Sequence, residues 1–420
     1  FNGGIDLYFY EKSWFRGEGN WTQNQEHRDP ESQKQRDNTY NMLIEHTLNF
    51  NKDFGKHHVD AVVGTTYQSH EWEGLWASRL NFPLISDEEW LHVLDAGKSN
   101  QQNTNSISKN AMISYLGRAN YIYDDKYYFT ATFRRDGTSR LSKENRWGNF
   151  PSISAAWRIS KEKFFKSSWI DDLKIRGNWG RLGNSSIGDW DYLGTINQSL
   201  VTIIGGVPVA GAAQVKLVNS NLVWETKETM NFGLDAAFLN QRLNVSAEYY
   251  NRKTTDMLLG YPKATSSGFS EYNANIGSMR NTGFEFSLGG SLIKTTDFIW
   301  NLTWMGSTVT NKVLKLTGES PEIIKGVFSI KEGMPINTYY MAKSAGVDPA
   351  TGAQLYWVYD KDDNGNITNE YISSDYQKAA NSKYYSGSRI PDLYGSINTD
   401  FSYKNFDLSI LGTYGKYKVT

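Results

Sequence analysis

Residues 127–134 run Tyr127-Tyr128-Phe129-Thr130-Ala131-Thr132-Phe133-Arg134, so that more apolar and more polar side chains alternate. Every second side chain of a β-strand points to the same face, and this segment therefore predicts a strand with one apolar and one polar face. The alternation recurs in residues 173–179, 232–238, 243–249 and 298–304. The polar faces carry amide and charged residues, where the core of a soluble sandwich would need aliphatic ones. We infer strands that separate two different solvents.

The links between such segments are alternately short and long. The short polar turns are residues 52–56, 124–126, 239–242, 294–297 and 403–405. The long links cover approximately residues 70–110, 136–149, 183–222, 252–274, 306–336 and 346–390. About sixteen strands in up-and-down order, with short turns at one rim and long loops at the other, are typical of transmembrane β-barrels. We therefore predict an all-β fold, an up-and-down antiparallel transmembrane β-barrel with long extracellular loops; a soluble all-β fold is the alternative.

In this fold, each link lies at one rim of the barrel, and each face of a strand meets either lipid or the lumen. We expect all short turns at the periplasmic rim, and a helical turn packed against a rim at residues 161–169. The residues expected to face lipid are Phe129, Phe133, Leu234, Phe238, Val245 and Trp300. Those expected to face the lumen are Thr130, Arg134, Lys174, Arg176, Asp235 and Glu248. Tyr and Trp at strand ends predict aromatic girdles at the membrane interfaces, although sheets favour aromatic residues in general.

The composition excludes several classes of protein. With 44 Lys and Arg against 45 Asp and Glu, the net charge of −1 leaves no basic excess for binding nucleic acid. No apolar run approaches the ~18 residues of a membrane-spanning helix. The chain contains no cysteine, which excludes disulfides, thiolate metal sites and cysteine nucleophiles.

The two ends of the sequence resemble cut ends. The chain starts at Phe1 without a signal peptide and stops at Thr420 directly after a strand-like alternation. We expect residues 1–420 to be the C-terminal β-barrel domain of a longer protein, incomplete at both ends, with the plug and N-terminal domains outside it.

Seven motifs follow one another from residue 114 onward. They are SYLGRANY (114–121), DKYY (125–128) leading to FRRDGTSR (133–140), RWGNFPSISAAWR (146–158), LKIRGNWG (173–180), NIGSMRNTGFE (275–285), GVDPATG (346–352) and PDLYGSIN (391–398). As a set, the motifs resemble the SusC/RagA family of TonB-linked outer-membrane transporters.

The resemblance implies a large barrel of about 22 strands whose lumen is closed by a plug. It also implies energy supplied through the TonB complex, a SusD-like surface lipoprotein as a lid, and a glycan or oligopeptide as the imported ligand. The location implied is the outer membrane of a Gram-negative bacterium.

Residues 360–371 match the start of a calcium-binding loop, with oxygen ligands at alternating positions and Gly365 at the sharp turn. The candidate ligands are Asp360, Asp362, Asn364 and Asn366. The twelfth position is Tyr371 rather than glutamate, and a plain Asx turn is the alternative.

No pattern predicts an enzyme. The six histidines lack the spacing of a zinc site, and neither a nucleophile elbow nor a phosphate-binding loop is present. Pairing any two of the 45 acidic residues into a glycosidase site has no support without a rigid cleft.

Two groups of residues are candidates for function. Aromatic residues of the long links could stack on sugar rings or peptide side chains, or could instead pack loop against loop: Trp72, Trp76, Trp90, Trp190, Tyr261, Tyr356 and Trp357. Basic residues are expected on the lumen wall, paired with plug carboxylates or neighbouring wall acids, or else solvated: Arg118, Arg134, Arg158, Lys174 and Arg176.

The sequence therefore predicts the barrel part of a TonB-dependent importer, not an enzyme, with lipid, a lid lipoprotein and the TonB complex as partners. A structural or adhesive outer-membrane barrel and a soluble all-β carbohydrate-binding protein are the alternatives.

Overall fold

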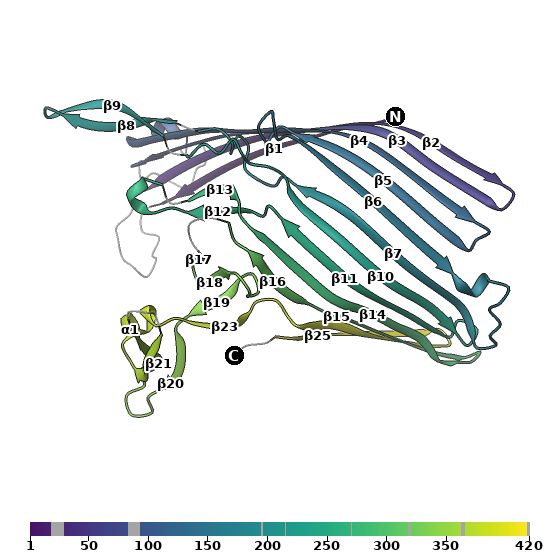
Figure 1. The fold of residues 1–420 in the computed structure, drawn as a ribbon. Coiled ribbons are helices and arrows are strands. Elements are labelled where there is room, and N and C mark those ends of the chain that lie inside the picture. The colour runs from purple at the N-terminus through teal and green to yellow at the C-terminus, as the bar shows by residue number, and fades with distance from the viewer. Residues whose placement is uncertain are drawn as a thin grey trace.

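The computed structural model describes residues 1–17, 29–82, 93–194, 196–214, 216–269, 271–317, 321–362 and 366–417. A 14-stranded antiparallel sheet dominates it and curls as a barrel wall does (Figure 1). Twelve-residue β5 and β6 are among its shorter strands, and β2 to β4 are twice as long. In order across the sheet the strands are β1 (Asn2–Arg16), β2 (Glu31–Phe54), β3 (His57–Leu80), β4 (Ser99–Tyr123), β5 (Tyr127–Thr138), β6 (Trp147–Arg158), β7 (Ile170–Asn184), β10 (Glu225–Phe238), β11 (Leu243–Thr255), β14 (Ser278–Lys294), β15 (Phe298–Thr308), β24 (Leu393–Tyr403) and β25 (Phe406–Lys416), with β16 (Thr310–Lys315) paired to β14.

Shorter elements are inserted in the links at one end of this sheet (Figure 1). They form four small sheets: β8 (Ile196–Ile204) with β9 (Val207–Gln214); β12 (Leu258–Pro262) with β13 (Glu271–Asn275); β17 (Glu322–Lys325), β18 (Phe328–Lys331), β19 (Thr338–Met341) and β23 (Tyr384–Ser388); and β20 (Lys343–Val347), β21 (Gln354–Lys361) and β22 (Ile367–Ser373). The helices are α1 (Tyr376–Asn381) and the 3₁₀ turns η2 (Leu94–Ala96), η3 (Ile159–Lys161) and η4 (Thr265–Ser267). No helix among the described residues has the length and apolarity needed to cross a membrane.

The order of strands confirms the predicted up-and-down topology. Because neighbours in the sheet are successive antiparallel strands, the turns β2–β3, β4–β5, β10–β11, β14–β15 and β24–β25 all lie at one end. These are the five short turns that the sequence assigned to a single rim. The long links lie at the opposite end. For residues 161–169, the 3₁₀ turn η3 starts slightly earlier than expected, at Ile159.

One assignment from the sequence was wrong. Most of residues 70–110, expected as a long loop, belongs to the outer halves of β3 and β4, and their register continues from Leu80 and Ser99 to the short turn. At ~3.3 Å per residue a 24-residue strand is about 80 Å long and far exceeds a ~30 Å hydrocarbon core. Both faces of its outer half therefore meet water, and the apolar alternation that marks a strand is lost there.

The register gives the sheet two unlike faces. Residues paired across strands point to the same side, and Phe129, Ala155, Gly177, Phe232, Tyr249 and Phe284 form one such row. The neighbouring row is polar: Thr130, Ser154, Asn178, Asn231 and Tyr250. All six residues expected to face lipid share the first face, and all six expected in the lumen share the second. The aromatic side chain of Phe133 is 52% exposed on its face, as a surface covered by lipid would be.

Charges on the polar face neutralise one another within the sheet. Arg176 on β7 contacts Asp235 on β10 and Glu248 on β11. To reach Glu248 its guanidinium crosses β10 at Gly233, where an added Cβ would lie 2.6 Å from Arg176 Cζ. The absence of a side chain at Gly233 thus lets one arginine join three strands.

The apolar clusters of the described residues lie at the long-loop end. One combines Tyr261, Ile276, Val313, Leu316, Ile323 and Ile330, and the other combines Leu141, Phe150, Leu222 and Trp224. These clusters hold the inserted segments against the end of the sheet by burying apolar side chains.

A carboxylate anchors the rim turn between β6 and β7. Glu162 Oε1 accepts hydrogen bonds from Tyr127 Oη at 2.6 Å and Trp157 Nε1 at 3.1 Å, and Lys126 Nζ lies 3.7 Å from Oε2. The Tyr127 hydroxyl is the main reason that the pKa of Glu162 lies below its ordinary value. The charged form is therefore the one that the folded turn prefers.

We predict that Glu162→Gln lowers the denaturation midpoint of the protein in detergent at pH 7. A carboxyl with a depressed pKa in the folded state stabilises above its unfolded pKa of ~4.3, and loses that effect as the pH falls through its folded value. The difference between Glu162→Gln and the wild type should therefore shrink as the pH falls below ~4.3 and vanish only below the lower pKa of the folded state. Exposed Glu144→Gln is the control and should shift neither midpoint nor pH dependence; a gap that persists in acid would argue against a role for the charge.

A second prediction concerns Gly233. Gly233→Ala and Glu248→Gln should be coupled by about 1 kcal/mol in a double-mutant cycle of unfolding free energies, because both break the same Arg176 contact. The coupling should disappear in an Arg176→Met background. Gly117→Ala is the control, since its Cβ would meet only Val63 Cγ1 at 3.9 Å. Additive effects of Gly233→Ala and Glu248→Gln would contradict the bridging role of Arg176.

Candidate functional site

The outer halves of β1 to β4 carry a patch that we call the aromatic rows. It comprises four rows of paired residues on the polar face of the sheet. The rows are Tyr8, Thr39, Trp72 and Ser108; Tyr10, Asp37, Gly74 and Ser106; Lys12, Gln35, Trp76 and Thr104; and Trp14, Gln33, Ser78 and Gln102. Five aromatic rings therefore stand among hydroxyl and amide groups.

Trp72 lies flat along its strand because Gly74 follows it two positions later. A Cβ on Gly74 would meet Trp72 Cζ2 at 2.5 Å and Asp37 Oδ1 at 3.0 Å, so the indole and this carboxylate oxygen meet above Gly74. Gln35 Nε2 donates to Asp37 Oδ2 at 2.8 Å, whereas Asp37 Oδ1 is buried and accepts no hydrogen bond within the described part of the chain.

Below the rows, toward the short-turn end, the polar face is hollowed. The hollow has a volume of about 460 Å³ and is lined by Asp6, Asn41, Leu43, Gln68, His70, Asn110 and Met112, among others. Asn41 joins two of its walls: its Oδ1 accepts a hydrogen bond from His70 Nδ1 at 2.7 Å, and its Nδ2 donates to Asp6 Oδ2 at 3.2 Å.

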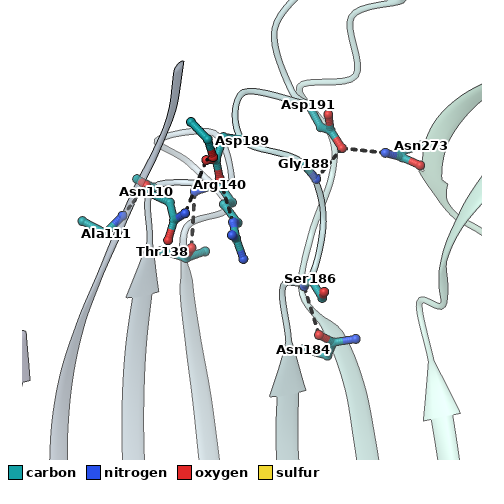
Figure 2. A network of polar contacts seen from close by, with 12 residues as sticks. Asn110, Ala111, Thr138, Arg140, Asn184, Ser186, Gly188, Asp189, Asp191 and Asn273 are labelled. Carbon is teal, nitrogen blue, oxygen red and sulfur yellow. Dashed lines mark hydrogen bonds and ion pairs between the residues drawn. The ribbon is translucent and has the colours of Figure 1, made fainter. Parts of the chain in front are cut away.

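The link after β7 is held by hydrogen bonds that Asp189 accepts from neighbouring elements, including Asn110 and Arg140 (Figure 2). Asp189 accepts hydrogen bonds from Ser108 Oγ at 2.5 Å, in the first aromatic row, from Asn110 at 3.3 Å and from Arg140 Nε at 2.8 Å. Burial by itself would raise the pKa of Asp189, but the hydrogen bonds from Ser108 and Arg140 outweigh it and keep the pKa below the ordinary value. A charged, nearly buried carboxylate thus joins the link to β4 and to the β5–β6 link.

Asp191 anchors the same link in another direction. It accepts hydrogen bonds from the Gly188 amide at 2.7 Å and Asn273 Nδ2 at 2.6 Å (Figure 2). It also pairs with Lys216. Trp190 stands between the two anchored aspartates, with φ of +62°, and remains 38% exposed. A bulky residue is strained in this left-handed conformation, and such strain persists only where the surroundings impose it.

The other predicted ligand contacts are placed differently. Tyr261 is 5% exposed inside an apolar cluster, and its ring meets Tyr272 edge to face at 6.0 Å. Tyr356 meets Tyr376 at 5.5 Å, and Lys343 lies 5.8 Å from the ring of Trp357. Trp90 lies outside the described residues. The structure thus brings together Trp72, Trp76 and the Trp190 link, while Tyr261, Tyr356 and Trp357 pack within the inserted sheets.

The candidate calcium loop turns back on itself. Asp362 accepts from the Asn366 amide at 2.8 Å and from its Nδ2 at 3.2 Å, and Asn369 Nδ2 lies 3.4 Å from Asp360. Asn364 lies outside the described residues. Over the described ranges, no group of three or more His, Cys, Asp or Glu residues is arranged to hold a metal.

All five predicted wall cations lie on the polar face, and four of them have acidic partners in the wall. Arg134 pairs with Asp136 at 2.7 Å, Arg158 with Asp172 at 2.8 Å, and Lys174 with Asp235 at 3.4 Å. Arg176 pairs with both Asp235 and Glu248. Arg118 donates instead to the amide oxygen of Asn120 at 3.2 Å.

Several residues of the patch were missed from the sequence. Tyr8, Tyr10 and Trp14 belong to β1, and Asp37 to β2. Period-two spacing of the aromatics, with Tyr8 and Tyr10 on one strand and Trp72 and Trp76 on another around Gly74, was the available signal.

Comparison with known proteins agrees with this geometry. Residues 2–420 match the family model described as TonB dependent receptor-like, beta-barrel. The chain is 33% identical over 398 residues to TonB-dependent receptor P3 of Formosa agariphila, covering 89% of this chain and 38% of that protein. It is 33% identical over 387 residues to TonB-dependent receptor SusC of Bacteroides thetaiotaomicron, covering 88% and 37%. The chain therefore spans less than half the length of these relatives.

Among solved structures, the RagAB peptide importer in its closed-closed state superimposes with a TM-score of 0.83 at 26% identity, over 98% of this chain and 45% of the importer chain. Such transporters belong to the outer membrane of Gram-negative bacteria, and the family is not one of enzymes. The soluble alternative is thereby excluded, and the chain belongs to the TonB-dependent receptor β-barrels of the SusC/RagA family.

Proposed function

We propose that the protein imports a glycan or an oligopeptide across the outer membrane, driven by the TonB complex. The observation that carries the proposal is the match of nearly the whole sheet to one chain of the RagAB peptide importer. A structural or adhesive barrel is the second candidate. The neutralised ion pairs on the polar face favour a transport role, since an adhesin needs no charged wall facing inward.

The polar face is then the wall of the import path. Its charges are already paired with one another, as for Arg134 with Asp136 and Arg176 with Glu248. A plug that moves against such a wall meets polar groups without having to separate unpaired ions, which would be costly in a partly dry lumen.

Energy has to come from outside the barrel. An outer membrane offers no nucleotide supply, so we assign the driving force to TonB acting on a plug, and the outer closure to a SusD-like lipoprotein. In this scheme the inserted sheets at the long-loop end, which carry exposed apolar side chains such as Ile203, Ile204 and Val207, are the surface available to a lid.

Deleting the gene from the bacterium that encodes the protein should abolish uptake of its labelled ligand, and disrupting TonB in the wild type should abolish it equally. The ligand can be found by screening growth on oligosaccharides and on peptides as sole carbon source. Complementation with the intact gene is the control. Uptake that needs the gene but survives the loss of TonB would contradict TonB-driven import, whereas uptake that survives deletion of the gene would favour the structural or adhesive barrel.

The faces of the wall can be tested because the protein has no cysteine. Thr132→Cys, on the polar face, should react with a water-soluble maleimide in liposomes, whereas Phe133→Cys, its neighbour on the apolar face, should be protected by lipid. Both should react after denaturation. Labelling of Phe133→Cys alone would reverse the faces and contradict the assignment of the wall.

A further inference from the structure

We propose that the aromatic rows, with Asp37 at their centre, are a stacking site for an uncharged oligosaccharide. This inference rests on the proposed import function and narrows it to one ligand chemistry. It assigns ligand contacts to Tyr8, Tyr10 and Trp14 on β1 and to Trp72 and Trp76 on β3.

The two faces of β1 to β4 differ in the types of residue that they carry. On the opposite face, the ion pairs Glu11–Arg36 at 3.0 Å and Glu71–Lys109 at 2.7 Å stand among exposed aliphatic side chains such as Leu75 and Ile107. The sixteen positions of the rows include five aromatic rings, five hydroxyls and three amides, but no aliphatic side chain. Water by itself does not select aromatic over aliphatic or charged residues.

Aromatic rings set among hydroxyls and amides complement a sugar, which has both apolar C–H faces and polar hydroxyl groups. The flat faces of the rings take the C–H faces of pyranose units, and the hydroxyl and amide groups both donate to and accept from sugar hydroxyls. The rings of Tyr8 and Tyr10 are nearly parallel, at 12°, with centroids 6.3 Å apart, so β1 places two rings in succession along the strand.

Asp37 supplies the point of recognition. Its buried Oδ1 accepts no hydrogen bond within the described part of the chain and sits against the indole of Trp72. A buried carboxylate oxygen without a donor is costly, and a sugar hydroxyl would supply that donor if the Trp72 indole, which covers Oδ1, shifts as the sugar stacks on it. Gln35 holds the other oxygen and so fixes the carboxylate beside Trp72.

The charges argue for an uncharged ligand. Lys12 and Asp37 are the two charged residues among the sixteen, and they offset each other. An acidic glycan would need an excess of cations, and a peptide would need partners for its charged termini. Nor can a peptide add as a further strand to β2 or β3, because both edges of each are already paired.

The Trp190 link supports the same site. Asp189 binds Ser108 in the first row, so the strained turn that carries Trp190 is fixed next to Trp72's row. The anchoring lets the link approach a bound ligand without first becoming ordered.

The test is calorimetric titration of the purified protein in detergent with neutral hexasaccharides (maltohexaose, cellohexaose and xylohexaose), hexagalacturonate and a pool of casein peptides. We expect at least one neutral hexasaccharide to bind. Trp72→Ala combined with Trp76→Ala should weaken its binding at least tenfold, and Asp37→Asn several-fold. Trp72→Tyr, which keeps a ring, should retain affinity to within about threefold, and Trp304→Ala on the apolar face should leave it unchanged.

Each other result overturns the assignment. Binding of hexagalacturonate or peptides without neutral sugars, no binding of any neutral sugar, or neutral binding that ignores Trp72, Trp76 and Asp37 would each do so. Gel mobility of the unheated variants reports whether they fold. Failure here is distinct from failure of the import proposal: peptide uptake that requires TonB would leave import standing, whereas sugar binding without TonB-dependent uptake would leave the site standing.

Discussion

The hydrogen-bonded register of one long sheet governs the rest of the molecule. In a strand, successive side chains must point to opposite faces, so a single register decides the surroundings of every residue in the wall. Phe129 and Phe232 lie on the apolar face for the same reason that Arg134 and Arg176 lie on the polar face. A slip by one residue would bury charges in hydrocarbon and expose aromatic rings to water, and the two errors together make the correct register strongly preferred.

The same register serves different solvents along its length. Near the short turns, the outward face carries rings such as Phe129 and Trp157, whereas farther along β1 and β2 the outward face carries Glu11 paired with Arg36. The inward face changes in parallel, from the ion pairs around Arg176 to the rings around Trp72. One continuous hydrogen-bonded sheet therefore carries an apolar face, an ion-paired polar face and the aromatic rows.

The sequence predicts the structure best where the two faces of a strand meet different solvents. Alternation sufficed for the strands, the short turns and the faces of Phe133 and Arg134, because lipid and lumen impose opposite demands there. It was insufficient in the outer half of β3, where both faces meet water and Trp72 seemed to belong to a loop. It also could not distinguish Tyr261 from an exposed aromatic, since its burial depends on Val313 and Ile330, which come from elements far along the chain.

The candidate site combines side chains on paired strands with a link that is held by hydrogen bonds. The rings of β1 and β3 are fixed by strands whose backbone groups are paired, and Trp190 is held by two buried aspartates that compensate for its left-handed backbone. Ordering these groups is achieved during folding, so binding a ligand there costs little further conformational entropy. Aromatic side chains, with only two side-chain torsions, add large contact area at small entropic cost. A weakly interacting ligand such as a neutral sugar gains most from such a site, because few of its contacts are individually strong.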